Sequence, residues 1–227
     1  MSQAGGTLAL MLRFSEEILL LALDDATGKL HPLPERAIDF ATVGALLMEL
    51  AFANRVDTCD KELNIIDRSP TGDALLDAML ATLPADIDTL PIANALTASL
   101  VKATDFRQEL FDSLKTKGIL KQEDHRFLWV MHERRYPLLD ETEEAEVKSR
   151  IRDVILNEAI PDPRDVVIIC LMHACDLSQY VFSEQELERV RPRIEQVSKM
   201  DFIGQALATA IQRIQQAILE SIAYMGM

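Results

Sequence analysis

Two long apolar segments constrain the fold of this chain more than any other feature. Residues 40–53 contain one charged side chain, Glu49, and residues 166–175 contain one strongly polar side chain, His173. A helix that is apolar on every side is stable only when protein surrounds it. Both segments are shorter than the roughly 20 apolar residues that a membrane-spanning helix needs. We therefore expect two buried central helices, with Gly44 allowing a neighbour to pack closely.

Cap and breaker residues predict further helices around these two. Side chains suited to accept hydrogen bonds from a first helical turn occur at Ser15, Asp39, Asp105, Asp140, Asp162 and Ser183. Gly118 predicts the end of the helix that begins near Asp105. Pro192 is expected to end or kink the helix that follows Ser183. The chain has only 8 glycines and 9 prolines, which disfavours a turn-dense β fold.

Short strands are predicted in two places. Residues 119–121 and 126–131 flank a polar turn at 122–125, a pattern typical of a hairpin that follows a helix. Residues 56–58 and 63–66 repeat this arrangement. A helix followed by a hairpin is similar to a winged helix, but a net charge of −14 repels nucleic acid. We expect no nucleic-acid partner.

The chain organisation predicts one domain. No low-complexity linker divides the 227 residues. The prediction is a mainly α fold, a single compact helical domain over residues 12–227 with buried central helices and one or two short β-hairpins. A flexible N-terminal segment at residues 1–11 precedes it. Three cysteines without framework spacing and the lack of a secretory signal indicate a cytoplasmic protein.

Catalytic and metal-binding motifs are missing from the sequence. It has no P-loop, no G-x-G-x-x-G and no nucleophile elbow. Cys170, His173 and Cys175 share one predicted helix, but their spacing points them in different directions, so they do not converge on one metal. We interpret them as buried thiols and a core histidine. The expectation is no enzyme, no metal and no cofactor, although a pocket of converging carboxylates needs no motif.

The cations of the chain are unevenly distributed. Residues 101–164 hold 12 of the 23 lysines and arginines. Six of them fall within 21 positions, namely Lys115, Lys117, Lys121, Arg126, Arg134 and Arg135. Lys148, Arg150 and Arg152 follow on the next predicted helix. This run is compatible with a local anion-binding surface. A solvated face balanced by neighbouring acids is the simpler explanation, and Glu144 is one helical turn from Lys148.

Five segments together resemble the Golgi phosphoprotein 3 family. In chain order they are SEEILLLALDDATGKL (15–30), GALLMELA (44–51), PTGDALLD (70–77), LKTKGIL (114–120) and RRYPL (134–138). The resemblance extends over roughly residues 12–180. It implies a compact, mainly helical adaptor rather than an enzyme. Its eukaryotic members are peripheral membrane proteins that recognise phosphatidylinositol 4-phosphate and bind cytoplasmic tails of Golgi glycosyltransferases.

The lipid-binding residues of the eukaryotic pattern are only partly present. A tryptophan of that pattern falls on Pro34, and two of its arginines fall on Val43 and Thr104. A third arginine matches Arg107. These departures indicate a prokaryotic-type member.

The resemblance and the cation-rich segment together predict the function. We expect a non-catalytic adaptor, cytoplasmic and peripheral to the membrane, that binds an anionic phospholipid head group and a protein partner. The candidate head-group residues are Arg107, Arg36, Arg134 and Arg135. The alternative is a soluble protein-protein interaction module without a lipid site.

An apolar stripe runs along the C-terminal segment. It comprises Ile203, Leu207, Ile211, Ile214, Ile218 and Ile222. The opposite face is rich in glutamine and has few cations, which disfavours a helix lying in a membrane interface. We expect the stripe to pack onto its own domain, with a symmetric homodimer as the alternative.

Overall fold

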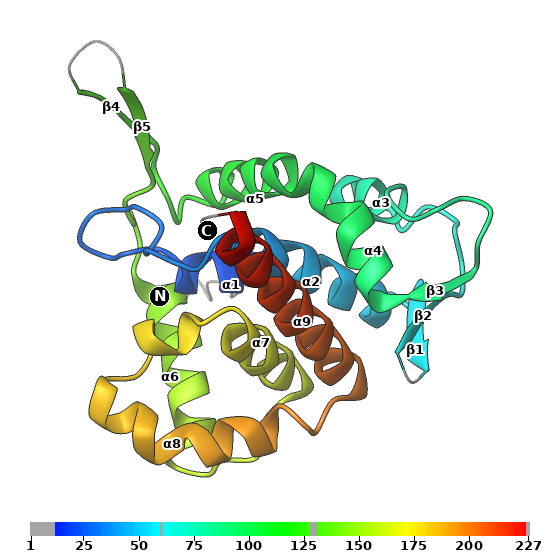
Figure 1. Cartoon of the computed structure of the whole chain (residues 1–227). Helices are drawn as coiled ribbons and strands as arrows, with labels where there is room; N and C mark the ends of the chain where they lie inside the picture. Colours follow the sequence, from blue (N-terminus) through cyan, green and yellow to red (C-terminus); the bar gives the residue numbers. More distant parts are fainter. Residues whose placement is uncertain (1–11, 60, 128–130, 226–227) are drawn as a thin grey trace, which may run out of the picture.

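The computed structural model describes residues 12–59, 61–127 and 131–225, and its fold is mainly α (Figure 1). The helices are α1 (Phe14–Leu21), α2 (Ala37–Phe52), α3 (Ala74–Leu80), α4 (Ile92–Ser99), α5 (Ala103–Thr116), α6 (Thr142–Leu156), α7 (Pro163–Ala174), α8 (Glu184–Val197) and α9 (Phe202–Met225), with 3-10 turns at Leu100–Lys102 and Leu177–Tyr180. The expectation of a flexible segment at 1–11 concerns residues outside this description.

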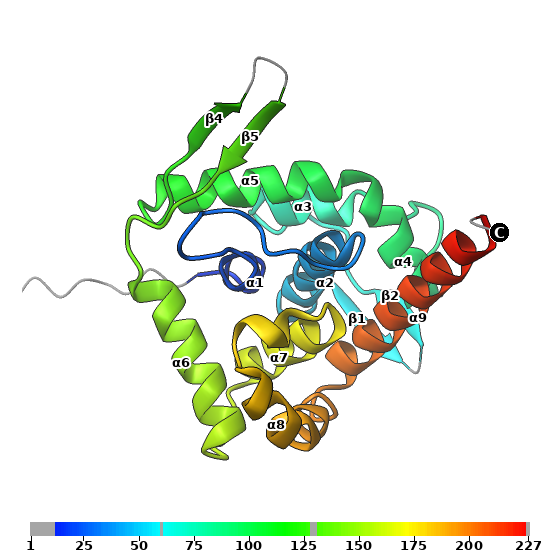
Figure 2. The same ribbon diagram turned by 60° about the vertical axis from the view of Figure 1, so that its left-hand side comes forward.

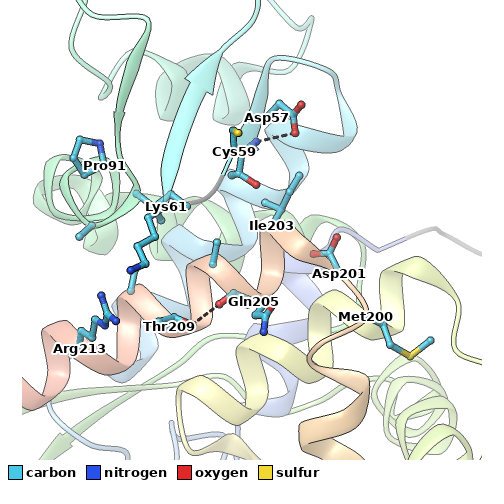
Figure 3. A pocket seen from close by; sticks show the side chains of 15 residues that line it. Asp57, Cys59, Lys61, Pro91, Met200, Asp201, Ile203, Gln205, Thr209 and Arg213 are labelled. Carbon is cyan, nitrogen blue, oxygen red and sulfur yellow. Dashed lines mark hydrogen bonds between the residues drawn. The ribbon is translucent and has the colours of Figure 1, made fainter.

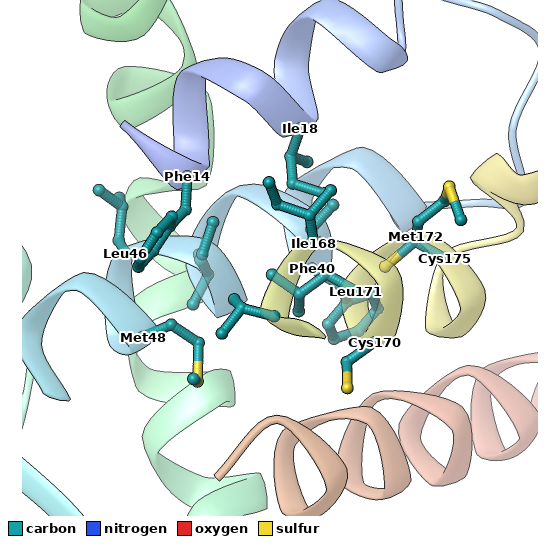
Figure 4. Close-up of a cluster of buried hydrophobic side chains, with 14 of the residues drawn as sticks. Phe14, Ile18, Phe40, Leu46, Met48, Ile168, Cys170, Leu171, Met172 and Cys175 are labelled. Atoms are coloured by element: carbon teal, nitrogen blue, oxygen red, sulfur yellow. The ribbon is translucent and has the colours of Figure 1, made fainter. Parts of the chain in front are cut away.

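Helices α2 and α7 form the centre of the molecule, as the sequence predicts. Phe40 of α2 and Ile168 of α7 are fully buried, and Figure 4 shows both within one cluster with Ile18 of α1. A Cβ atom placed on Gly44 would lie 2.7 Å from Cδ2 of Leu171. The glycine therefore lets the two central helices approach closely.

Several helices begin at residues other than the predicted caps. Helix α1 begins at Phe14, so Ser15 lies inside it. The hydroxyl of Ser15 donates to Oε1 of Glu49 at 2.8 Å instead of capping the helix. Helix α2 begins two residues before Asp39. Helix α5 begins at Ala103, because the 3-10 turn before it leads directly into the helix and leaves Asp105 in the first turn.

Other caps lie where the sequence predicts them. Asp162 accepts from the backbone N–H of Arg164, and Ser183 forms a capping box with Glu186. Gly118 follows α5 with a φ of +77°, the left-handed conformation typical of a helix end.

The expectation that Pro192 ends or kinks a helix is wrong in its first part. Helix α8 continues through Pro192 to Val197. The apolar face of α8 is buried on both sides of the proline, at Val190 and at Ile194. We attribute the continuity to this packing, which offsets the lost backbone hydrogen bond.

The strands form two small antiparallel sheets. The first has the order β1 (Val56–Cys59), β2 (Glu62–Ile65), β3 (Thr89–Pro91), so the predicted hairpin gains a third strand. The second pairs β4 (Glu123–Phe127) with β5 (Met131–Arg135). The predicted turn at 122–125 is wrong, because most of it belongs to β4. In the observed register Glu123 pairs with Arg135 and Asp124 pairs with Arg134.

The C-terminal stripe packs onto its own domain over the part that can be described. Leu207 and Ile211 are fully buried, while Ile203 and Ile214 are partly buried against the core. Helix α9 contacts α7, α4 and α2, and Figure 2 shows its last turns extending past α4. The side chains of Ile218 and Ile222 lie outside the description. Among the described helices, none has both the length and the apolar character required to cross a bilayer.

Candidate functional site

Two of the four predicted arginines come together at the start of α2. Nη1 of Arg107, on α5, contacts Oδ1 of Asp39. Nε of Arg36 lies 3.5 Å from the other carboxylate oxygen, Oδ2 of Asp39. Arg36 and Arg107 are 71 positions apart in the sequence, and the packing of α2 against α5 brings them to one carboxylate.

The backbone around Arg36 is held in an uncommon conformation. Arg36 has φ +61°, in the left-handed region that a residue with a Cβ seldom adopts. Its Nη2 also donates to the carbonyl of Leu100 at 3.4 Å. The preceding loop is anchored by Tyr180, whose hydroxyl donates to the carbonyl of Pro32 at 2.6 Å and whose ring stacks on His31 at 3.8 Å. Strain of this kind is often found at functional positions.

The Arg36–Asp39–Arg107 cluster is open to solvent. The side chain of Arg36 is 41% exposed, that of Arg107 20% and that of Asp39 17%. Next to Leu100, Val101 is 82% exposed. The cluster thus combines two guanidinium groups, one carboxylate and an exposed apolar side chain on one surface. Its formal charge is +1 within a chain of net charge −14.

Comparison with known proteins shows the family to which the chain belongs. The profile of the Golgi phosphoprotein 3 (GPP34) family matches residues 14–214. The chain belongs to the Golgi phosphoprotein 3 family. Among curated proteins, vacuolar protein sorting-associated protein 74 of Eremothecium gossypii is 28% identical over 218 residues. The match covers 81% of this chain and 64% of that relative, so the chain spans less than two thirds of the relative's length.

The positions where this Golgi phosphoprotein 3 member departs from the eukaryotic pattern differ in their surroundings. Val43 is completely buried in α2. Pro34 and Thr104 are exposed, and Thr104 lies three residues before Arg107 on α5. An arginine is therefore compatible with position 104 and not with position 43 as the side chains now pack. The assignment as a prokaryotic-type member stays a prediction.

Arg134 and Arg135 belong to a different element, the hairpin β4–β5. The residue that follows them, Tyr136, stacks its ring on Phe111 at a centroid distance of 3.7 Å. Phe111 is one helical turn beyond Arg107 on α5, so the base of the hairpin stands beside the cluster. Arg135 is partly buried, and the side chain of Arg134 lies outside the description.

Most other cations of the middle segment pair with acids. Nζ of Lys117 lies 2.5 Å from Oε2 of Glu16, and Nη2 of Arg150 lies 3.1 Å from Oε1 of Glu17. Glu16 and Glu17 are buried at the start of α1. Burial raises the pKa of Glu17, although Arg150 and Arg164 oppose the shift. The sequence signals acidic residues in a first turn but not their burial, which depends on distant parts of the chain.

The cysteine and histidine positions are partly as expected. Cys170 and Cys175 are fully buried, and burial raises the pKa of the Cys170 thiol to about 12. His173 is only partly buried and lines a surface pocket, so its interpretation as a core histidine is wrong. Within the described ranges, no group of three or more histidine, cysteine, aspartate or glutamate side chains is placed to hold a metal ion.

Sequence reasoning does not identify Asp39 as a site residue, because its position before an apolar run indicates a helix cap. Arg36 and Asp39 are three residues apart at a helix start, and this spacing predicts the ion pair between them. The ion pair between Arg107 and Asp39 depends on how α2 and α5 pack, which the sequence does not indicate.

Proposed function

We propose that this protein is a non-catalytic adaptor at a membrane surface. In this proposal, Arg36 and Arg107 bind the phosphorylated head group of an anionic lipid, and another surface of the molecule binds a protein partner. The observation that carries the proposal is the convergence of the two arginines on Asp39 at an exposed surface. Family membership supports it, and the name of the similar fungal protein associates that relative with protein sorting.

The chemistry of the cluster suits a phosphate. A guanidinium group donates two parallel hydrogen bonds to phosphate oxygens, and such charge-assisted bonds are stronger than neutral ones. Asp39 holds both arginines at the same place before a ligand arrives, which lowers the entropic cost of ordering them. A phosphomonoester carries about −1.5 to −2 charges at neutral pH, more than the single charge of Asp39 with which it competes.

The surroundings of the cluster suit a membrane surface. Val101 can enter the lipid interface while Arg36 and Arg107 contact the head group. The net charge of −14 opposes approach to an anionic bilayer over distances up to the Debye length, about 10 Å at 0.1 M salt. We therefore expect binding to require a locally dense phosphate rather than a diffuse negative surface.

Vesicle flotation at low salt tests the proposal. The vesicles contain phosphatidylcholine alone, with phosphatidylserine, or with phosphatidylinositol 4-phosphate. We expect binding to the last composition and a loss of about tenfold or more for Arg36→Gln and for Arg107→Gln, because each removes hydrogen bonds to a charged group, worth about 1.5–3 kcal/mol. Equal binding of both variants and the parent protein would contradict the assignment of the site.

Position 104 provides a test by gain of function. Thr104→Arg places a third guanidinium group beside Arg107 and should strengthen binding to phosphatidylinositol 4-phosphate vesicles. Thr116→Arg is the matched control, with the same substitution on the same helix, twelve residues or about 18 Å away. Equal gains for the two variants would indicate a general effect of charge and not a head-group site.

The alternative function is a protein interaction module without a lipid site. Two observations favour it: Asp39 already neutralises one of the two arginines, and Val43 is buried at a position where the eukaryotic pattern has arginine. No binding to any vesicle at low salt, with no gain for Thr104→Arg, would support this alternative and overturn the proposal.

A further inference from the structure

A second ligand site is suggested by a groove far from the arginine cluster. It measures about 830 Å³ and lies between α9, the first strand β1 and the junction of β3 with α4 (Figure 3). Specific small-molecule pockets usually measure about 300–1,000 Å³. The sixteen residues of α2 separate the groove from Arg36, a distance of about 24 Å along the helix.

One end of the groove is cationic. Figure 3 shows Lys61 and Arg213 reaching toward the same end from opposite walls. Neither side chain makes a hydrogen bond or an ion pair with any other residue that the structure describes. Two like charges that converge without a shared acid favour an anion between them, and most other cations described above are already paired.

The rest of the groove is mainly apolar, with the carboxylates of Asp57 and Asp201 at the end away from Lys61 and Arg213 (Figure 3). Its wall on α9 presents Ala206 and Ala210, and its wall on α4 presents Ala93. These small side chains leave a slot between the elements. The slot extends along α9 from Ile203 to Arg213, ten positions or about 15 Å. An unbranched alkyl chain can contact these alanines along the length of the slot.

We infer that this groove binds a linear aliphatic anion, with the alkyl chain along α9 and the charged end between Lys61 and Arg213. The shared chemistry is an unbranched chain that ends in a carboxylate or a phosphate. Charge complementarity at one end and apolar contact along the other walls carry the assignment. The site is independent of the head-group site at Arg36 and Arg107, so either assignment can fail alone.

Cys59 offers a direct measurement, because it lines the groove and is exposed, while Cys170 and Cys175 are buried. The rate of its modification by N-ethylmaleimide, an uncharged reagent, is measured on the full chain with dodecanoate, dodecyl phosphate, dodecanol or dodecyltrimethylammonium below their micelle concentrations. We expect saturable protection of at least threefold by one or both anions and less than twofold by the alcohol and the cation. The two anion arms distinguish a carboxylate from a phosphate ligand.

Variants test the geometry of the site. Lys61→Gln and Arg213→Gln should each raise the anion concentration needed for half protection by about tenfold, whereas Arg189→Gln on α8 should not change it. Ala206→Leu fills the slot and should abolish binding measured by calorimetry, whereas Ala217→Leu, exposed on the same helix, should preserve it. Melting temperatures confirm that each variant is folded.

Three outcomes would overturn the inference. The first is the absence of saturable protection by either anion. The second is protection by dodecanol as strong as that by dodecanoate. The third is protection that survives unchanged in both Lys61→Gln and Arg213→Gln. Retention of anion binding in Arg36→Gln and Arg107→Gln would support the groove and separate it from the head-group site.

Discussion

At the residue scale, Gly28 links the turn after α1 to the segment that follows β5. Its φ is +64°, and a Cβ atom there would lie 2.5 Å from the backbone nitrogen of Pro137. Gly118 also has a positive φ, but nothing lies within 4 Å of its Cβ position. We expect Gly28→Ala to cost more than about 2 kcal/mol and Gly118→Ala about 1 kcal/mol, since only the first adds a backbone clash to the conformational strain. Urea unfolding compares them, and equal losses would contradict the explanation.

Glu144 is a residue whose protonation should influence stability. It is 3% exposed on α6, and Nζ of Lys148 lies 2.6 Å from its Oε1. Burial, together with the hydrogen bond that protonated Glu144 donates to the Asp25 carboxylate, raises the pKa of Glu144 to about 7 from an ordinary 4.5. Between these two pKa values the folded state binds more protons than the unfolded state, so the free energy of unfolding falls as pH rises through this window. Above about pH 7 the whole of this loss of stability is present.

The variant Glu144→Gln removes this titration. Relative to the parent protein, its free energy of unfolding should increase by about 3 kcal/mol as pH rises from about 4.5 to about 8, an upper value at 1.36 kcal/mol per pH unit. Glu188→Gln, on the exposed face of α8, is the control. Denaturant titrations at several pH values measure the difference, and a difference that does not change with pH would refute the raised pKa.

At the element scale, a buried ion-pair group joins α1, α6 and α7. Arg150 on α6 contacts Glu17 of α1 and Asp165 of α7, each at 3.1 Å, and both acids are buried. Arg150→Met leaves two buried carboxylates with fewer partners and should cost about 3–5 kcal/mol. Adding Glu17→Gln should recover part of that loss, while Arg189→Met on α8 should be nearly neutral. Chemical unfolding measures each variant; no recovery in the double variant would contradict a charge-based cause.

The sequence predicts elements whose signals are local and fails where the decisive partner is distant. The central helices follow from the scarcity of charged and strongly polar residues in 40–53 and 166–175. The cap at Asp162 needs only its own helix. In contrast, Ser15 contacts Glu49 and Asp39 contacts Arg107, so neither acts as the predicted cap. The same limit applies to the site: Arg107 is recognisable from the family pattern, but its pairing with Arg36 through Asp39 depends on tertiary packing.

At the scale of the whole molecule, the two proposed sites lie toward opposite ends of α2. The arginine cluster is at the start of the helix, and the groove borders β1, which follows its end. Two arginines converge at the first site, and two cations meet at one end of the second, on a chain of net charge −14. Such exceptions suit the proposed adaptor, which would reject diffuse polyanions and still bind a defined anionic ligand.

Helix α9 completes the core of the molecule, and its removal tests that role. A chain ending at residue 201 loses Leu207 and Ile211, which are buried against the core. Truncating one such side chain to alanine usually costs about 2–5 kcal/mol, comparable with a large share of the stability of a typical domain. We therefore expect the 1–201 chain to aggregate or to melt at a much lower temperature.

A chain ending at residue 217 is the matched control for this deletion. It keeps Leu207 and Ile211 and loses the later stripe positions, Ile218 and Ile222. We expect it to remain folded, with a melting temperature near that of the full chain, because its deepest contacts are intact. Light scattering on both chains reports the oligomeric state, and a dimer formed only by the full chain would assign residues 218–227 to an interface between copies. A well-folded 1–201 chain with an unchanged melting temperature would show that α9 is not part of the core.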